Sequence, residues 1–245
     1  MNTTTTSYRD TVRSLAAAQK GKASGAPLYS VMVNRPVGRL LAAACFRAGL
    51  TPNQVTGISA LCSAIGVAVL FAMDPSWVSG ILVWFLLALG YAFDSADGQV
   101  ARLRGGGSPA GEWLDHVVDC VKINAVHLGV FAGVWLNQDV WPNWTAVIPL
   151  AFLVVGNTSF FTMILNDSLK QIHGVALRKP GQYNWKRSVL ALPTDYGILC
   201  LSFVLLGALP LFLGFYAVLF IGSLGHLTLA LRKWYRDMEA LPSKR

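Results

Sequence analysis

The fold is decided by residues 78–119, which read VSGILVWFLLALGYAFDSADGQVARLRGGGSPAGEWLDHVVD. An apolar run ends in a polar segment that holds four aspartates of a chain with only twelve acidic residues: Asp94, Asp97, Asp115 and Asp119. Carboxylates beside hydrocarbon are costly unless a partner or a metal compensates them, so they are candidates for function. The stretch therefore predicts two membrane helices that meet at a charged end.

The composition is that of a membrane protein. Hydrophobic residues make up 54% of the chain and charged residues 13%, with a mean hydropathy of +0.49. Soluble chains average about 25% charged residues, and a crossing helix needs about 20 apolar residues. We therefore expect an all-α integral membrane protein with six transmembrane helices, at roughly 54–73, 78–98, 113–136, 145–166, 194–209 and 212–231.

The basic residues predict the orientation of these six helices. Nineteen of the twenty lysines and arginines fall on one side of the membrane if all six segments cross it, and the exception is Lys122 inside the third segment. The positive-inside rule then places both termini and the aspartates on the cytoplasmic side of the cell membrane. The same asymmetry accounts for the net charge of +8, so no nucleic-acid partner is expected.

The chain divides into four parts by composition. Residues 1–33 are polar and are expected to be flexible. Residues 34–50 alternate arginines with apolar residues, as in an amphipathic helix that lies on the cytoplasmic leaflet. Residues 51–233 form the six-helix membrane domain that holds the aspartates, opened by Thr51 as an N-cap with Pro52 behind it. Residues 234–245 form a cytoplasmic basic tail.

Helical spacing predicts that the four aspartates converge. Asp94 and Asp97 are three residues apart, and Asp115 and Asp119 are four apart, so each pair lies on one helix face. The loop between the pairs is short enough to make the two helices antiparallel neighbours. Four close carboxylates need cations, and hard oxygen ligands suit Mg²⁺ or Mn²⁺.

Such a cluster also suggests a chemistry. Two divalent ions about 4 Å apart could bridge a pyrophosphate, while one carboxylate acts as general base for a hydroxyl. Gly98 and Gly111 would allow a ligand or a neighbouring helix to approach the backbone closely. Arg102 offers a bidentate fork to phosphate.

At this point the chain resembles a known family. The pattern D-x2-D-G-x2-A-R-x8-G-x3-D-x3-D is the signature of the CDP-alcohol phosphotransferases (CDP-alcohol phosphatidyltransferases). All eight motif residues are present: Asp94, Asp97, Gly98, Ala101, Arg102, Gly111, Asp115 and Asp119. Residues 34–56 show a softer likeness to members that join CDP-activated polyols to phosphorylated polyols.

The resemblance implies a reaction and the roles of these residues. A hydroxyl of an acceptor alcohol would attack the β-phosphorus of a CDP-alcohol, CMP would leave and a phosphodiester would form, as in phospholipid biosynthesis. By analogy, Asp94, Asp97 and Asp115 hold two Mg²⁺ or Mn²⁺ ions, and Asp119 is the catalytic base and a further ligand. The cytidine diphosphate pocket would be formed by Gly98, Ala101, Arg102 and Gly111, with Asn53 and Thr56 as further candidates. The resemblance also implies a homodimer.

The substrates stay open at this stage. The donor could be CDP-diacylglycerol with a small polar or phosphorylated acceptor, or a soluble CDP-polyol with a phosphopolyol or lipid acceptor. A phosphorylated acceptor or an anionic head group could dock on a basic loop: Lys170, Arg178, Lys179, Lys186 and Arg187. These charges could equally serve only to orient the protein. Asp195 could orient an acceptor hydroxyl or simply cap a helix.

Two other classes of function compete with an enzyme. In a cation transporter, intramembrane carboxylates would form an ion path, but here they crowd one end of the helices. A catalytically silent scaffold would not need the intact motif.

Several polar residues also have structural interpretations. Lys122 could neutralise the aspartates or tune Asp119. His116, His127 and His226 are interpreted as packing or hydrogen-bonding residues. The four cysteines lack metal or disulfide spacing and are interpreted as packing residues.

Overall fold

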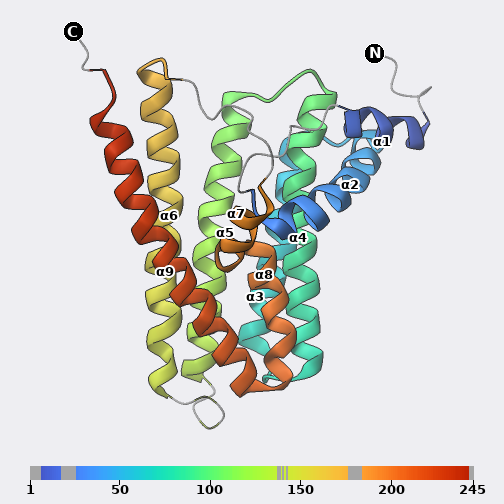
Figure 1. Cartoon of the computed structure of the whole chain (residues 1–245). Coiled ribbons are helices and arrows are strands. Elements are labelled where there is room, and N and C mark those ends of the chain that lie inside the picture. Colours follow the sequence, from blue (N-terminus) through green and yellow to red (C-terminus); the bar gives the residue numbers. More distant parts are fainter. Residues whose placement is uncertain are drawn as a thin grey trace.

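The computed structural model describes residues 7–17, 26–136, 139, 141, 143–175 and 184–242, and over these ranges it is all-helical. Long helices run side by side, and α1 lies at the same end of the bundle as the C-terminal end of α9 (Figure 1). The elements in chain order are α1 (Tyr8–Ala17), η1 (Ser30–Asn34), α2 (Arg35–Arg47), α3 (Pro52–Ala72), α4 (Trp77–Leu103), α5 (Pro109–Leu136), η2 (Asn143–Ala146), α6 (Val147–Ile172), α7 (Trp185–Leu190), η3 (Leu192–Thr194), α8 (Tyr196–Ser202), η4 (Phe203–Gly207) and α9 (Leu209–Glu239).

Five helical segments of the described chain are long and apolar enough to cross a membrane: α3, α4, α5, η2 with α6, and α9. The expected sixth crossing at 194–209 is not confirmed. Its place is taken by α8 and η4, a shorter apolar helix over Tyr196–Gly207. At 1.5 Å per residue its twelve residues reach only about 18 Å, against about 30 Å of hydrocarbon. The chain is thus an integral membrane protein, and the described residues hold five helices that are long and apolar enough to span the membrane.

The helix beginnings follow from local capping. Thr51 Oγ1 accepts from the Gln54 N–H at 3.3 Å, and Gln54 Oε1 accepts from the Thr51 N–H at 2.8 Å. This reciprocal capping box satisfies two backbone donors at the start of α3, and it confirms Thr51 as the expected N-cap. Asp195 caps α8 in a similar way, through the N–H of Gly197.

The N-terminal region packs on the end of the bundle where the aspartates were expected. α2 buries a face of small residues against α4, and a Cβ on Gly38 would lie only 2.8 Å from Ser95. Residues 1–33 were expected to be flexible, yet they include α1, whose Leu15 is buried against the core beneath α2. The Tyr8 hydroxyl also donates to the Leu40 carbonyl at 3.1 Å. Apolar contacts that the sequence pattern did not reveal therefore order this helix.

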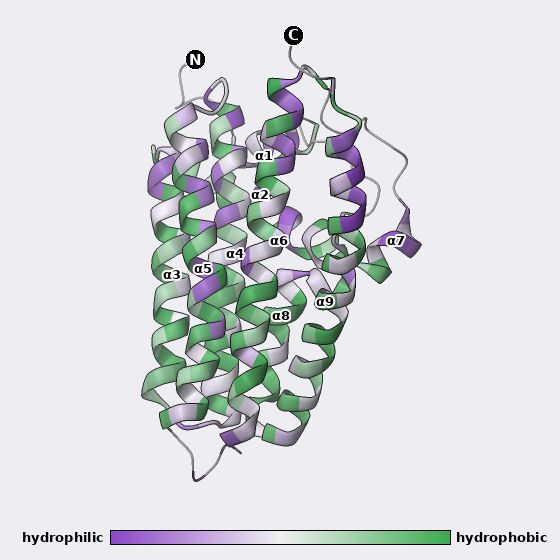
Figure 2. Cartoon of the chain, turned by 90° about the vertical axis from the view of Figure 1, so that its left-hand side faces the viewer, coloured by the Kyte–Doolittle hydropathy of each residue, from purple (hydrophilic) through white to green (hydrophobic). Residues whose placement is uncertain are grey.

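The apolar core lies toward the opposite end of the bundle. Figure 2 shows hydrophilic residues gathered near α1, the C-terminal end of α9 and on α7, and mainly hydrophobic residues toward the opposite end of the bundle. His127 Nδ1 lies 2.6 Å from the Tyr216 hydroxyl, and its ring stacks on Phe152. This confirms the interhelical hydrogen bond expected for His127, whereas His226 is exposed. All four cysteines are free.

Close packing at Gly80 gives the first testable prediction. A Cβ at Gly80 would lie 2.4 Å from the Phe203 carbonyl oxygen, which is held in the backbone of η4. We expect Gly80→Ala to lower the free energy of unfolding by about 1–3 kcal/mol through overpacking, measured by thermal or denaturant unfolding in detergent. Gly225→Ala is the control, because a Cβ there would meet nothing within 4 Å. Equal stability of the two variants would contradict the tight contact of α4 with η4.

Candidate functional site

The two aspartate-bearing helices are joined by a glycine turn. Gly105 and Gly106 have φ angles of 97° and 133°, a backbone region that residues with a Cβ rarely adopt. The chain reverses there, so α4 and α5 run antiparallel, as expected. Among the described helices, however, α3 packs closely against both α4 and α5. The aspartates therefore meet over the first turns of α3, and α3 contributes to the site.

Three of the four aspartates form one group. Oxygen atoms of Asp94, Asp115 and Asp119 all lie within 4.8 Å of one another, and the three residues are partly buried. Two oxygens on one Mg²⁺ at 2.0–2.1 Å can be at most about 4.2 Å apart, so small side-chain shifts suffice to bind it. The donor set of hard carboxylate oxygens also fits Mg²⁺ or Mn²⁺. The group can therefore hold a divalent cation.

Asp97 lies beside this group and is anchored by α3. It is buried, and its Oδ2 accepts a hydrogen bond from Thr56 Oγ1 at 2.6 Å. It is near enough to Asp115 for Coulombic interaction. Thr56 was expected as a nucleotide contact, but in the structure its hydroxyl positions a carboxylate of the motif.

Lys122 is a buried cation that contacts two members of the aspartate group. Its ammonium forms an ion pair with Asp94, lies 2.8 Å from Asp119 Oδ1, and donates to Ser59 Oγ at 3.4 Å. The residue is only 7% exposed. Lys122 was expected either to neutralise the aspartates or to tune Asp119. Its ion pairs with two of the aspartates directly support neutralisation.

Sequence reasoning missed Ser59. The available signal was a stripe of hydroxyl residues at i, i+3 and i+7 on an otherwise apolar helix: Thr56, Ser59 and Ser63. All three are buried. A polar stripe of this kind on a membrane helix indicates the face that looks toward the other polar groups.

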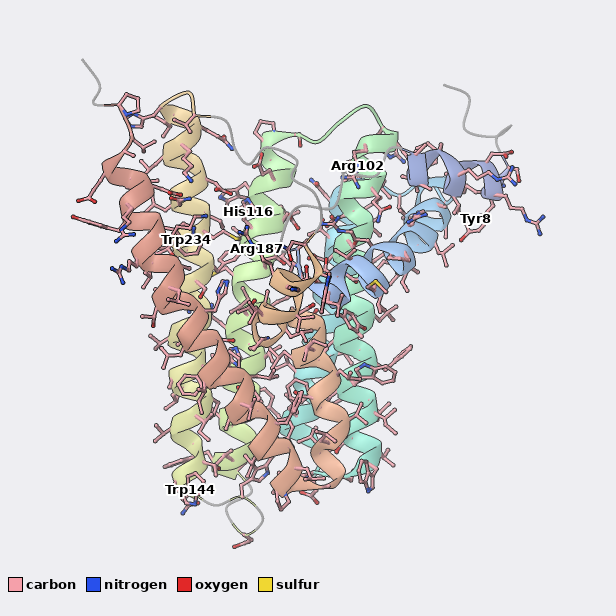
Figure 3. The ribbon with its side chains drawn as sticks, viewed as in Figure 1. Tyr8, Arg102, His116, Trp144, Arg187 and Trp234 are labelled. Carbon is pink, nitrogen blue, oxygen red and sulfur yellow. The ribbon has the colours of Figure 1, made fainter. Side chains whose placement is uncertain are left out.

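The expected nucleotide residues gather at the same end of the bundle. Asn53 and Gly111 are neighbours, because a Cβ on Gly111 would lie 3.3 Å from Asn53 Oδ1. Arg102 is exposed near the end of α4 (Figure 3) and follows Ala101, one turn beyond Gly98. Arg104, by contrast, donates to the carbonyls of Gly49 and Leu50 at 2.9 Å each, which holds the corner between α2 and α3.

The residues expected to dock an acceptor are spread out. Lys170 pairs with Asp237 of α9 at 2.7 Å. Lys186 and Arg187 are both exposed on α7, and Figure 3 shows Arg187. Arg178 and Lys179 lie outside the described residues.

Asp195 is buried and faces backbone. One of its oxygens accepts from the Tyr29 N–H at 2.8 Å and the other from the Gly197 N–H at 3.1 Å. Burial raises the pKa of this carboxyl, and the backbone hydrogen bonds oppose that rise. Both oxygens therefore have partners that link the N-terminal segment to α8.

The contacts of the His116 ring are with residues outside the aspartate group, although His116 follows Asp115 in the chain. Its Nε2 is 4.0 Å from Glu112, and its ring meets Phe160 edge-on. These contacts agree with the packing role expected for it.

Comparison with known proteins adds independent findings. The family model described as CDP-alcohol phosphatidyltransferase matches residues 49–231, which are 183 of the chain's 245 residues. The chain is 38% identical over 107 residues to a phosphatidylinositol phosphate synthase of Mycobacterium marinum, covering 44% of each protein. The match thus spans less than half of that relative.

Solved structures share the fold. The phosphatidylinositol phosphate synthase of Mycobacterium tuberculosis with CDP-DAG bound superposes with a TM-score of 0.58 at 24% identity, covering 87% of this chain and 98% of that one. A structure of the same enzyme with manganese and citrate gives a TM-score of 0.56 at 24% identity, covering 84% and 92%. At this identity the likeness concerns the fold.

The contact between Thr56 and Asp97 yields a second prediction. Thr56→Val removes the hydroxyl donor from a buried carboxylate, which we expect to cost about 1–3 kcal/mol. Thr56→Ser keeps the donor and should remain close to the wild type. The measurement is unfolding in detergent without divalent cations. A Val variant as stable as the Ser variant would rule out a stabilising role for this hydrogen bond.

Proposed function

Because the chain belongs to the CDP-alcohol phosphatidyltransferase family, we propose that it transfers a substituted phosphate from a CDP-alcohol to the hydroxyl of an acceptor alcohol, with release of CMP. The observation that carries this proposal is the meeting of Asp94, Asp115 and Asp119 within 4.8 Å on the two helices that bear the complete motif. A chance set of helix-end charges would require neither the spacing nor the convergence.

We assign a role to each site residue from its position in the structure. Asp94, Asp97, Asp115 and Asp119 are the proposed ligands of two Mg²⁺ or Mn²⁺ ions, which when bound would neutralise the charge on the pyrophosphate and the leaving phosphate. Thr56 holds Asp97 in place. One oxygen of Asp119 pairs with Lys122. We assign to Asp119 the role of the general base, which accepts the proton of the acceptor hydroxyl.

The nucleotide pocket is assigned to the ends of α3, α4 and α5. Gly98, Ala101 and Gly111 leave room beside the helix backbones for a ligand. Arg102 supplies the planar fork that suits a phosphate, and Asn53 supplies an amide near Gly111. Exposure of Arg102 at the end of the bundle supports its access to a nucleotide from solution.

For the donor we propose CDP-diacylglycerol, which makes the product a phospholipid. The Mycobacterium tuberculosis enzyme of the same fold was solved with CDP-DAG bound, and the aspartates lie at the polar end of membrane helices, where a lipid head group resides. A small phosphorylated alcohol is the proposed acceptor, with Lys186 and Arg187 as the best-supported dock, while Lys170 is already paired. A soluble CDP-polyol with a phosphopolyol is the alternative.

The membrane arrangement extends the same proposal. Both termini and the site would face the cytoplasm, where nucleotides are available, with α2 lying at that membrane surface. This topology requires the short apolar helix over Tyr196–Gly207 to complete a sixth crossing. The exposed apolar residues Val37 and Leu40 on α2 support contact with lipid. The homodimer implied by the family resemblance stays a prediction, which mass measurement in detergent would test.

Loss of CMP release on mutation of Asp119 is the third prediction. Asp119→Asn keeps shape and removes the base, and we expect the rate of CMP release from CDP-diacylglycerol to fall by about 10²–10⁴-fold. Glu112→Gln, an exposed carboxylate on the same helix, is the matched control and should keep its activity. Chelation with EDTA should abolish the wild-type reaction, and Mg²⁺ or Mn²⁺ should restore it.

Two outcomes would reject the assignment. An Asp119→Asn enzyme as fast as the control would remove the proposed base. Uptake of divalent cations into proteoliposomes without any CMP release would favour a cation transporter.

The basic residues of α7 supply the fourth prediction. Replacing Lys186 and Arg187 by Gln removes two positive charges, so we expect KM for a phosphorylated acceptor to rise several-fold while kcat changes little. The control is KM for the CDP-alcohol donor, which should stay the same. A KM for the acceptor that does not change would leave these charges with a topological role only.

A further inference from the structure

We propose that Lys122 is an internal counter-ion that gives the aspartate group a low intrinsic affinity for divalent cations, so that tight cation binding requires the pyrophosphate of the nucleotide. The inference rests on the proposed function, because it assumes that the aspartates bind metal. It concerns a residue outside the eight-residue motif.

The contacts of Lys122 set it apart from an ordinary surface lysine. Its ammonium contacts Oδ1 of Asp94 and Oδ1 of Asp119, two of the three residues in the carboxylate group. Ser59 Oγ of α3 is its third partner. The three N–H groups of the ammonium are thus matched by three oxygen acceptors, one from each of α3, α4 and α5. Because Lys122 is only 7% exposed, water does not compete for these contacts.

Its position is on the inner side of the group. Lys122 follows Asp119 by three residues and Asp115 by seven along α5, which places it farther from the glycine turn than either. One oxygen of Asp94 and one of Asp119 are engaged by the lysine. Each carboxylate keeps its second oxygen, so the lysine and a cation can act on the same two residues from different sides.

Charge then decides the direction of the effect. A cation on Asp94 and Asp119 would lie within a few ångströms of the ammonium, and repulsion between a double and a single positive charge is strong at the low effective dielectric of a buried site. The lysine also orients the two carboxylates, which favours the cation, but a hydrogen bond contributes less than that repulsion. The net effect of Lys122 is to weaken cation binding.

The nucleotide reverses this effect. A pyrophosphate adds negative charge next to the cation and so offsets the repulsion from Lys122. Cation and nucleotide should therefore bind cooperatively, and by linkage each raises the affinity for the other by the same factor. Before the nucleotide arrives, Lys122 stabilises the carboxylates in place of a metal.

The test is titration of purified full-length protein with Mn²⁺, in which electron paramagnetic resonance measures the free ion, with and without CDP. For the wild type we expect CDP to lower the Kd for Mn²⁺ by about tenfold or more. In Lys122→Met the Kd without CDP should already be about tenfold lower than in the wild type, and the effect of CDP should shrink. Addition of Mn²⁺ should also raise the unfolding temperature of this variant more than that of the wild type.

The controls separate charge from packing. Lys122→Arg keeps the charge and should bind Mn²⁺ like the wild type, whereas Lys122→Gln keeps hydrogen-bonding capacity without charge and should resemble Lys122→Met. Lys170→Met breaks another lysine–aspartate pair, that with Asp237, and should leave the Kd for Mn²⁺ unchanged. If neither neutral variant folds, the titration of the wild type is the test. A wild-type Kd for Mn²⁺ that is the same with and without CDP overturns the inference.

The remaining outcomes distinguish this inference from the proposed function. A Kd in Lys122→Met that is equal to or higher than the wild-type Kd overturns the counter-ion role, while wild-type CMP release keeps the proposed function intact. A wild type that neither binds Mn²⁺ nor releases CMP overturns both.

Discussion

The structure is organised around the need to keep several carboxylates charged beside hydrocarbon. Isolated ionised groups there are too costly to persist, so each must find a partner. Lys122 partners Asp94 and Asp119, and Thr56 partners Asp97. These partners come from α3 and α5, so the packing of three helices is tied to the electrostatic balance of one site.

Much of the fold was predictable because its causes are local. The long apolar runs, the capping box at Thr51 and the glycine turn at Gly105 and Gly106 depend on residues adjacent in the chain. The convergence of the aspartates was predictable for the same reason, since helical periodicity places Asp115 and Asp119 on one face. Membership of the family then follows from eight residues at fixed spacing.

What could not be predicted depends on contacts between distant segments. Periodicity says nothing about which helix lies between two others, so the insertion of α3 beside both α4 and α5, and with it Ser59, was missed. The sixth crossing is not confirmed, because hydropathy counts apolar residues but does not show where a helix begins and ends. The apolar helix found there runs from Tyr196, after the Asp195 cap, to Gly207. The order of α1 likewise comes from a tertiary contact of Leu15.

The hydrogen bond from the Tyr29 N–H to Asp195 joins residues 166 positions apart. During synthesis Tyr29 is made first, and its acceptor does not exist until 166 further residues have been added. Contacts of such long range form after local structure. This hydrogen bond of Tyr29 must therefore wait until the chain has been made as far as α8, although the contacts of α1 with α2 need no such wait.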